Sequence, residues 1–315
     1  MEFLCPACHS KNGRLVETVP IRAIATAWAD GTNHGEGRTA DQISTWISED
    51  IGATQISFRQ CMNCGLEIAQ PQRSWSSEHY PQTKHFLGFD HIEALAVLEK
   101  LPPASILDIG CADGQFLEAA NAQGHRSVGI DFTRADIAAA QGRGLDARVA
   151  DVAELANAYP AGHKFDVVTL FQVIEHLNDP DAIFSQIATV TAPGGRLFVG
   201  CPSDRRYTRR FNQPQRINRS DFWDYPPQHT LRWTVEALER FLPRHGWQIE
   251  KVTYEPLQIV GAAAHIAHLY ALAHHWPLRG LRRRAASLYW MGRVVASRLF
   301  TNTTGLRVVV EAKHV

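Results

Sequence analysis

Between residues 90 and 202, short apolar runs alternate with segments of helical periodicity. The apolar runs predict strands over 104–110, 126–131, 146–152, 164–174 and 196–202. The segments between them predict helices over 91–101, 115–124, 134–144 and 181–191, with a turn at 192–195. The run KFDVVTLFQVI (164–174) is nearly all apolar, as a strand buried on both faces requires. This alternation predicts a doubly wound α/β sheet that binds its ligand at the carboxyl ends of the strands.

Four of the six cysteines form two Cys-x-x-Cys pairs, Cys5/Cys8 and Cys61/Cys64. Four thiolates can hold a tetrahedral Zn²⁺ in a closed, structural site. We therefore predict a zinc-ribbon module over residues 1–80, whose insert contains a polar loop (30–41) and a strand (53–61). The alternative is that the pairs are independent redox-active or buried cysteines.

The 315 residues carry 32 basic and 32 acidic side chains, but these are unevenly distributed. Residues 1–100 have 8 basic against 12 acidic, 101–201 have 6 against 12, and 202–315 have 18 against 8. The ordinary apolar content excludes a disordered or collagen-like chain, and six cysteines are too few for a disulfide scaffold. The N-terminus lacks a signal-peptide pattern, so we expect a cytoplasmic protein with reduced thiols.

A glycine-containing turn, LDIGCADGQF (107–116), follows the first strand of the sheet. Gly110 and Gly114 allow a ligand to approach the backbone at a helix N-terminus. Asp131 ends the second strand, where a carboxylate can accept both hydroxyls of a ribose, and Asp151 ends the third. The turn lacks the third glycine of dinucleotide sites, and its acids would repel a diphosphate. An acidic pocket suits a ligand with a sulfonium and an ammonium group.

These motifs together resemble the class I S-adenosylmethionine-dependent methyltransferases, and more narrowly their branch with an N-terminal zinc ribbon. The matching segments are LDIGCADG, GID ending at Asp131, VADV around Asp151, FDVVTLFQVIEHLNDP (165–180), APGGRLFVGCP (192–202) and FRQCMNCGLEIAQP (58–71). The chain departs at Ala112, where many members have glycine, an exchange that we expect to cost little.

The resemblance implies a seven-stranded, mostly parallel sheet over 81–256 and 305–315, closed by an antiparallel pair of strands (247–256 and 305–315) after a helix (234–245). It also implies S-adenosylmethionine as the methyl donor. The residues implied to bind it are Asp108, Gly110, Cys111 and Gly114 at the amino acid part, Asp131 at the ribose, Asp151 and Val152 at the adenine, and Phe171 and Gln172 beside the methionine part.

Two histidines are candidates for the base that deprotonates the methyl acceptor, because imidazole titrates near neutral pH. His176 follows the fourth strand of the sheet and is the first choice. His229 precedes the helix at 234–245 and is the second. The alternative is that such a histidine only caps a helix or orders a loop.

The basic last third contains two distinctive segments. Residues 203–227 carry six arginines, three aspartates and five aromatic residues, and predict a lid that binds a small anionic acceptor; a solvated loop is the alternative. Residues 257–304 carry six arginines and no acidic residue, and predict a helical insert. We expect this insert to cover the active site or to form a homodimer contact. The alternative is a peripheral membrane element that binds anionic lipid through Arg279, Arg282, Arg283 and Arg284. Its His265 and His268 are expected to be packing residues.

The leading hypothesis is methyl transfer from S-adenosylmethionine to oxygen, nitrogen or carbon of a small anionic acceptor, with a purely structural zinc. One alternative is a zinc-ribbon protein that binds or modifies RNA, although the acidic first two-thirds argue against a nucleic-acid partner. The other is an NAD-dependent Rossmann oxidoreductase, which the composition of the turn disfavours.

Overall fold

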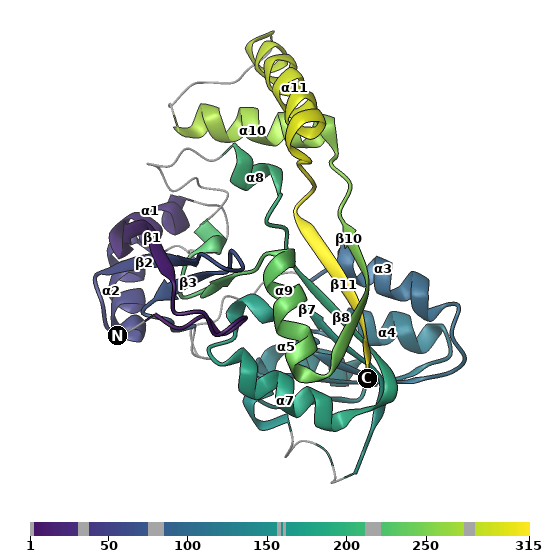
Figure 1. Ribbon diagram of the computed structural model, residues 1–315. Helices are drawn as coiled ribbons and strands as arrows, with labels where there is room; N and C mark the ends of the chain where they lie inside the picture. Colours follow the sequence, from purple (N-terminus) through teal and green to yellow (C-terminus); the bar gives the residue numbers. More distant parts are fainter. Residues whose placement is uncertain are drawn as a thin grey trace.

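The computed structural model describes residues 3–30, 38–74, 85–155, 159, 162–211, 222–273 and 281–315. Two sheets lie side by side, and a pair of helices projects from them (Figure 1). Parts of the polar loop (30–41) and of the lid segment (203–227), together with Arg279, fall outside the described residues.

The larger sheet has seven strands in the order β10-β11-β8-β7-β4-β5-β6. The strands are β4 (Ser105–Ile109), β5 (Arg126–Asp131), β6 (Ala147–Val149), β7 (Phe165–Phe171), β8 (Thr191–Pro202), β10 (Trp247–Tyr254) and β11 (Arg307–His314). Strands β6, β5, β4, β7 and β8 are parallel, whereas β11 is antiparallel to both β8 and β10. This sheet confirms the predicted fold class.

Helices cover both faces of this sheet because its strands are apolar on both sides. The helices are α3 (Phe89–Leu98), α4 (Gln115–Ala122), α5 (Arg134–Gly142), α7 (Pro180–Val190) and α9 (Val235–Phe241). Neighbouring residues of β4 face opposite layers, with Ile106 packed among α3 and α4 and Leu107 in the core that contains α7 and α9. The result is a three-layer α/β/α arrangement (Figure 1).

Three predicted boundaries are wrong. The predicted strand over 146–152 ends at Val149, and the chain enters a 3₁₀ helix at Val152. The predicted strand over 164–174 ends at Phe171, and a short 3₁₀ helix, η2 (Ile174–His176), follows it. The predicted turn at 192–195 belongs to β8, whose register with β7 is irregular where Gly194 adopts a φ of +74°. The glycines that predicted a turn at 192–195 therefore lie in a bulge within β8.

The smaller sheet lies at the N-terminus and has its own helices and core. Strands β1 (Gly13–Pro20), β2 (Gln55–Cys61) and β3 (Glu67–Gln70) pair antiparallel, and α1 (Ile21–Asp30) and α2 (Ala40–Ile51) pack on them. Sequence reasoning missed both helices. A signal for α2 is present, since Thr39 and Gln42 form a reciprocal capping box at its start.

The two sheets are joined through β9 (Leu231–Arg232), which pairs with β3 of the smaller sheet. Arg232 is buried, and its Nη1 lies 3.2 Å from both Glu17 Oε2 and Glu67 Oε2. Its Nε lies 3.0 Å from Asp224 Oδ2, and its guanidinium stacks 3.6 Å above the ring of Phe58. One buried cation therefore links two strands of the N-terminal module to the segment that precedes β9.

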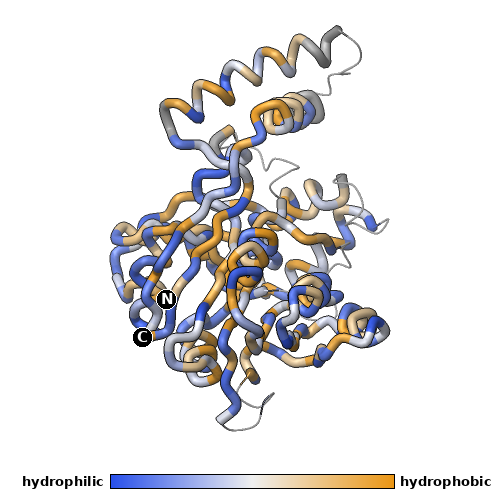
Figure 2. Tube along the Cα trace, turned by 90° about the vertical axis from the view of Figure 1, so that its right-hand side faces the viewer, coloured by the Kyte–Doolittle hydropathy of each residue, from blue (hydrophilic) through white to orange (hydrophobic). Residues whose placement is uncertain are grey.

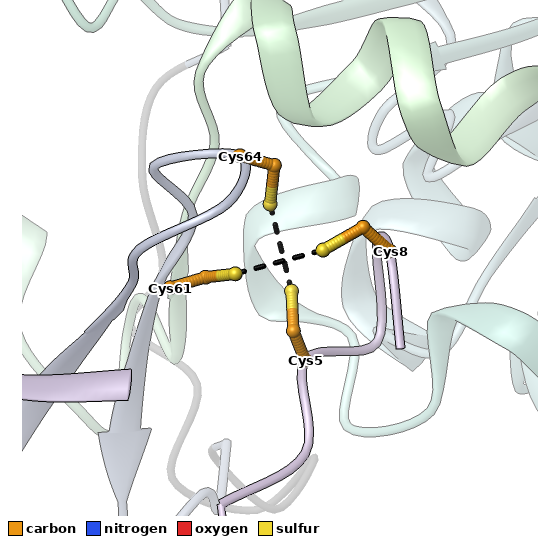
Figure 3. Close-up of side chains that lie close together, drawn as sticks. All are labelled: Cys5, Cys8, Cys61 and Cys64. Atoms are coloured by element: carbon orange, nitrogen blue, oxygen red, sulfur yellow. Dashed lines mark hydrogen bonds between the residues drawn. The ribbon is translucent and has the colours of Figure 1, made fainter. Parts of the chain in front are cut away.

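The four paired cysteines converge on one point beside this junction (Figure 3). Cys5 Sγ lies 3.6 Å from Cys64 Sγ, and Cys8 Sγ lies 3.5 Å from Cys61 Sγ. Zinc–sulfur bonds of about 2.3 Å place the sulfurs of a tetrahedral site about 3.8 Å apart, so these thiols need only a small outward shift. The donor set and its spacing are compatible with one Zn²⁺, in which every coordination position is taken by protein.

The expected helical insert lies between β10 and β11 as a pair of helices, α10 (Ile259–Ala273) and α11 (Leu281–Thr301). They pack on the short helix α8 (Tyr207–Arg210), and His265 Nδ1 lies 2.8 Å from the Tyr207 hydroxyl. Within the described parts of the chain, no helix has the length and apolar composition needed to cross a bilayer.

Replacing Arg232 should destabilise the fold strongly, because Arg232→Ala leaves Glu17, Glu67 and Asp224 without their shared buried cation. We expect the free energy of unfolding to fall by about 3–5 kcal/mol in urea denaturation. The matched control is Arg240→Ala, which removes an exposed pair with Glu236 and should leave the midpoint nearly unchanged. Equal midpoints for the two variants would show that the network does not stabilise the junction.

Metal analysis of the purified protein should find one zinc ion per chain. Cys61→Ser should lower the zinc content and the melting temperature together, because metal binding contributes to the free energy of folding. Cys201→Ala, a buried cysteine outside the cluster, should keep its zinc. Substoichiometric zinc in the unmodified protein, with no gain in melting temperature on adding zinc, would contradict a structural zinc site.

Candidate functional site

The site is built on the turn between β4 and α4, where the backbone is forced into left-handed conformations. Gly110 and Gly114 have φ values of +78° and +82°. A Cβ at Gly110 would lie 2.5 Å from Val173 Cγ2, so a side chain there would clash. The amide of Gly110 donates to Ile130 O at 2.8 Å, which holds the turn against the end of β5. Both glycines are thus required by the shape of the turn.

Ala112, in the same turn, corrects an expectation. Its φ is +47°, in the region that favours glycine, so alanine there stores strain of about 1 kcal/mol. The exchange for glycine is therefore not free of cost. The strained amide of Ala112 donates to Asp131 Oδ2 at 3.1 Å, which couples the turn to the end of β5.

Asp131 ends β5 as predicted, whereas Asp151 lies two residues beyond the end of β6 and caps a short 3₁₀ helix, η1 (Val152–Glu154). Asp131 accepts a second hydrogen bond, from the Thr133 amide at 2.7 Å, and burial raises its pKa. The Ala150 amide donates to Asp131 O, so Asp151 lies one residue beyond the contact between β5 and β6. Asp151 is exposed and accepts from the Ala153 amide at 2.8 Å, and the neighbouring Val152 is half-buried.

Two of the predicted cofactor residues lie beneath the turn. Asp108 is only 2% exposed and accepts a hydrogen bond from Thr169 Oγ1 at 2.6 Å; burial raises its pKa to about 7. The Cys111 side chain is buried and packs with Leu117 and Ile137. Both side chains are buried, so they support the turn from within the protein.

Phe171 and Gln172 lie at the end of β7, where they contact two residues of α3, Asp90 and His91, that the sequence analysis did not identify. The Phe171 ring centroid lies 4.5 Å from that of His91 and 5.0 Å from that of Phe116. Gln172 has a φ of +57°, and its Nε2 donates to Oδ2 of the buried Asp90 at 2.8 Å. Asp90 and His91 belong to α3, whose sequence showed only an amphipathic pattern. A strained residue at a strand end is typical of a functional site.

A second missed group lies on the other side of the turn. His85 Nε2 lies 3.3 Å from Asp136 Oδ2, and this carboxylate raises the pKa of His85. The backbone carbonyl of His85 accepts from Gln115 Nε2 at 2.6 Å. Within the described chain, Asp113 Oδ1 is buried and has no hydrogen-bond partner. This orphaned acceptor, together with Asp131, fits a ligand that carries donors and positive charge.

Both candidate bases lie in one cluster at the end of β7. The ring centroids of His176 and His229 are 4.9 Å apart. His229 Nδ1 lies 3.4 Å from Asp224 Oδ1, and its Nε2 lies 3.9 Å from Glu175 Oε1. His176 Nδ1 donates to the carbonyl of Gln228 at 2.5 Å. The structure thus brings together two histidines that are 53 residues apart in the sequence.

Burial determines the charges in this cluster. It lowers the pKa of His176 to about 3 and also lowers that of His229, so both rings are neutral at pH 7. Burial raises the pKa of Glu175 to about 8, so this carboxyl group is largely protonated. Burial also opposes ionisation of Asp224, but Arg206 and Arg232 hold its pKa well below the usual range. Asp224 is therefore the permanent anion beside His229.

The cluster has two chemical capabilities. Neutral His229, oriented by Asp224, can accept a proton from a bound hydroxyl. The donor atoms of Glu175, His176 and His229 also lie within 4.8 Å of one another, a spacing that one metal ion could bridge.

Of the three lid-segment arginines whose side chains are described, two form ion pairs inside the protein. Arg206 Nη2 lies 2.5 Å from Asp224 Oδ2, and Arg209 forms an ion pair with Glu67. Arg205 stacks 4.7 Å from the Tyr254 ring. Arg216 and Arg219 lie outside the described residues. Two of the arginines expected to bind an anionic acceptor therefore neutralise internal carboxylates instead.

Curated relatives match only part of this chain. A ubiquinone biosynthesis O-methyltransferase of Hahella chejuensis is 31% identical over 132 residues, which is 40% of this chain and 55% of the relative. Its counterpart in Xanthomonas campestris pv. campestris (strain B100) is 32% identical over 137 residues, 42% of this chain and 56% of the relative. The chain thus spans about half the length of these relatives.

Solved structures are similar at a lower level. A methyltransferase from Archaeoglobus fulgidus that depends on S-adenosylmethionine has a TM-score of 0.47 at 17% identity, covering 71% of this chain and 94% of its own. A methyltransferase from Mesorhizobium loti, also dependent on S-adenosylmethionine, has a TM-score of 0.47 at 18% identity, covering 72% and 99%.

The family comparison covers the larger sheet up to β10. A model described as a methyltransferase domain matches residues 79–252, more than half of the 315 residues. That segment contains the turn after β4, Asp131 at the end of β5, Asp151 beyond the end of β6, and the cluster after β7. The chain belongs to the family of methyltransferase domains.

Proposed function

We propose that this protein transfers a methyl group from S-adenosylmethionine to a hydroxyl group of a small acceptor. The observation that carries the proposal is the pairing of an acidic, glycine-bent turn with a neutral, carboxylate-oriented histidine at the end of β7. Family membership supports the reaction type. The names of the curated relatives, which are O-methyltransferases, support oxygen over nitrogen or carbon as the acceptor atom.

The turn supplies the binding surface for the donor. Its glycines let the ligand approach the backbone, and Asp131 can exchange its bonds to the Ala112 and Thr133 amides for the two hydroxyls of a ribose. Asp113 Oδ1 has no partner among the described residues and can accept from an ammonium group. S-adenosylmethionine supplies an electrophilic methyl group on a positively charged sulfur.

The cluster supplies the base. As the acceptor oxygen attacks the methyl carbon, a C–O bond forms, the C–S bond breaks and its electron pair stays on sulfur. The acceptor proton moves to His229 Nε2, and Asp224 stabilises the imidazolium through Nδ1. His176 is the weaker candidate because its Nδ1 is bound to a backbone carbonyl rather than to a carboxylate.

We also propose that the acceptor is anionic. Fewer arginines support this than the sequence suggested. Arg206 and Arg209 are paired with Asp224 and Glu67. Arg205 is exposed near this site and is the described arginine best placed to meet a carboxylate or phosphate of the acceptor.

Calorimetry with S-adenosylhomocysteine tests the donor site directly. The unmodified protein should bind this product, and Asp131→Ala should weaken binding at least tenfold, because two hydrogen bonds to a charged group are lost. The control Asp146→Ala removes an exposed carboxylate close to the same strands and should bind normally. Binding of NAD in place of S-adenosylhomocysteine would refute the proposal.

Turnover of phenolic acceptors with deuteromethyl-labelled S-adenosylmethionine tests the base. His229→Ala should reduce kcat by about 10²–10⁴ while the affinity for S-adenosylhomocysteine stays the same, because the base acts only on the acceptor. His268→Ala, an exposed histidine on α10, should keep full kcat. Unchanged kcat in His229→Ala would exclude this residue as the base.

A further inference from the structure

The pair of helices α10 and α11 stands away from both sheets and is not explained by methyl transfer (Figures 1 and 2). Its inner side is packed. Val294 of α11 contributes to a small core with Ala263 and Ile266 of α10, and Trp290 packs against it. The helices therefore have a defined inner face, and the opposite face of α11 can be read from its exposed residues.

That outer face is apolar. Leu288, Val295 and Leu299 are 66%, 37% and 72% exposed. They are spaced seven and four residues apart, which places them on one line along a helix, with Ala285 and Gly292 between and before them. Such a helix is apolar on the side that faces away from the protein, the reverse of a helix that covers a core.

The helix that carries this stripe is basic. At 100° per residue, Arg298 lies about 80° from the line through Leu288 and is exposed. Arg293 lies about 140° away on the other side, where its guanidinium is 5.3 Å from the Trp290 ring. The sequence also places Arg282, Arg283 and Arg284 in the first turn of α11, and residues 257–304 contain no acidic side chain. An exposed apolar stripe on a basic helix without acidic residues is typical of helices that lie in the interface of an anionic membrane.

We propose that the outer face of α11 docks on the surface of an anionic phospholipid bilayer, with Leu288, Val295 and Leu299 among the acyl chains and the arginines at the phosphates. The helix has 21 residues, about 31 Å, and lies parallel to the surface. A second copy of this chain fits the same face poorly. Two α11 stripes in contact would bring their arginines together with no acid of the insert to neutralise them.

The docking face is connected to the proposed acceptor site. Tyr207 binds His265 of α10, and Phe211 packs against Trp290 of α11 at 5.8 Å between ring centroids. Arg206, which precedes Tyr207 in the chain, forms an ion pair with Asp224, and Asp224 orients His229. The segment that carries the acceptor-side charges is therefore packed directly on the membrane-binding element.

Flotation with phosphatidylcholine vesicles tests the proposal. One set is neutral and the other contains roughly 30–40% phosphatidylglycerol as the anionic lipid. The full chain should float with the anionic vesicles only, and less so as salt is raised. Leu288→Glu/Leu299→Glu should reduce the bound fraction at least tenfold, because two apolar anchors are lost. Arg298→Gln should reduce partitioning about fivefold.

The matched control is Leu15→Glu, an equally exposed leucine in β1, which should float like the unmodified protein. Binding of S-adenosylhomocysteine shows that each variant is folded, and it is independent of vesicle binding. Flotation that is unaffected by Leu288→Glu/Leu299→Glu would overturn the proposal. So would a dimer in analytical ultracentrifugation that these substitutions dissociate, without any vesicle binding by the unmodified protein.

Discussion

The buried guanidinium of Arg232 lies where the two sheets of this protein meet. It neutralises Glu17 and Glu67 from the N-terminal module and Asp224 from the segment before β9. Removing these carboxylates from water, partly or fully, is unfavourable without a cation among them, so Arg232 favours packing of the module against β9 and the segment before it. The cysteine cluster holds the opposite edge of the same junction, and Cys64 O accepts from Thr234 at the start of α9. The N-terminal module therefore packs directly against the methyltransferase domain.

This junction also determines the chemistry of the acceptor side. Asp224 stays ionised because Arg206 and Arg232 flank it, although burial alone would favour its neutral form. An ionised Asp224 orients His229 through Nδ1, and in the proposed reaction Nε2 takes the acceptor proton. The N-terminal module thus supports Asp224 indirectly, because its strands hold Glu17 and Glu67 beside Arg232, which in turn pairs with Asp224.

The sequence predicted the parts that depend on local pattern. Apolar runs identified the strands of the larger sheet, and two glycines identified the turn after β4. The paired cysteines predicted their own convergence. The helices α1 and α2 were missed because the insert between the cysteine pairs was read as a polar loop and one strand, although Thr39 and Gln42 signal a helix start. Ala112 was judged harmless because residue size alone does not reveal a φ of +47°.

By itself, the sequence determined the doubly wound fold, the acids at the strand ends and the basic character of the last third, since each follows from spacing and residue type. Only the tertiary structure decided which charges meet. It paired Arg206 and Arg209 with Asp224 and Glu67, leaving fewer arginines for an acceptor. It brought His229 beside His176, and it turned the leucines of α11 outward. The physical reason is that a charge or an apolar side chain acts according to its surroundings, and residues distant in sequence create those surroundings.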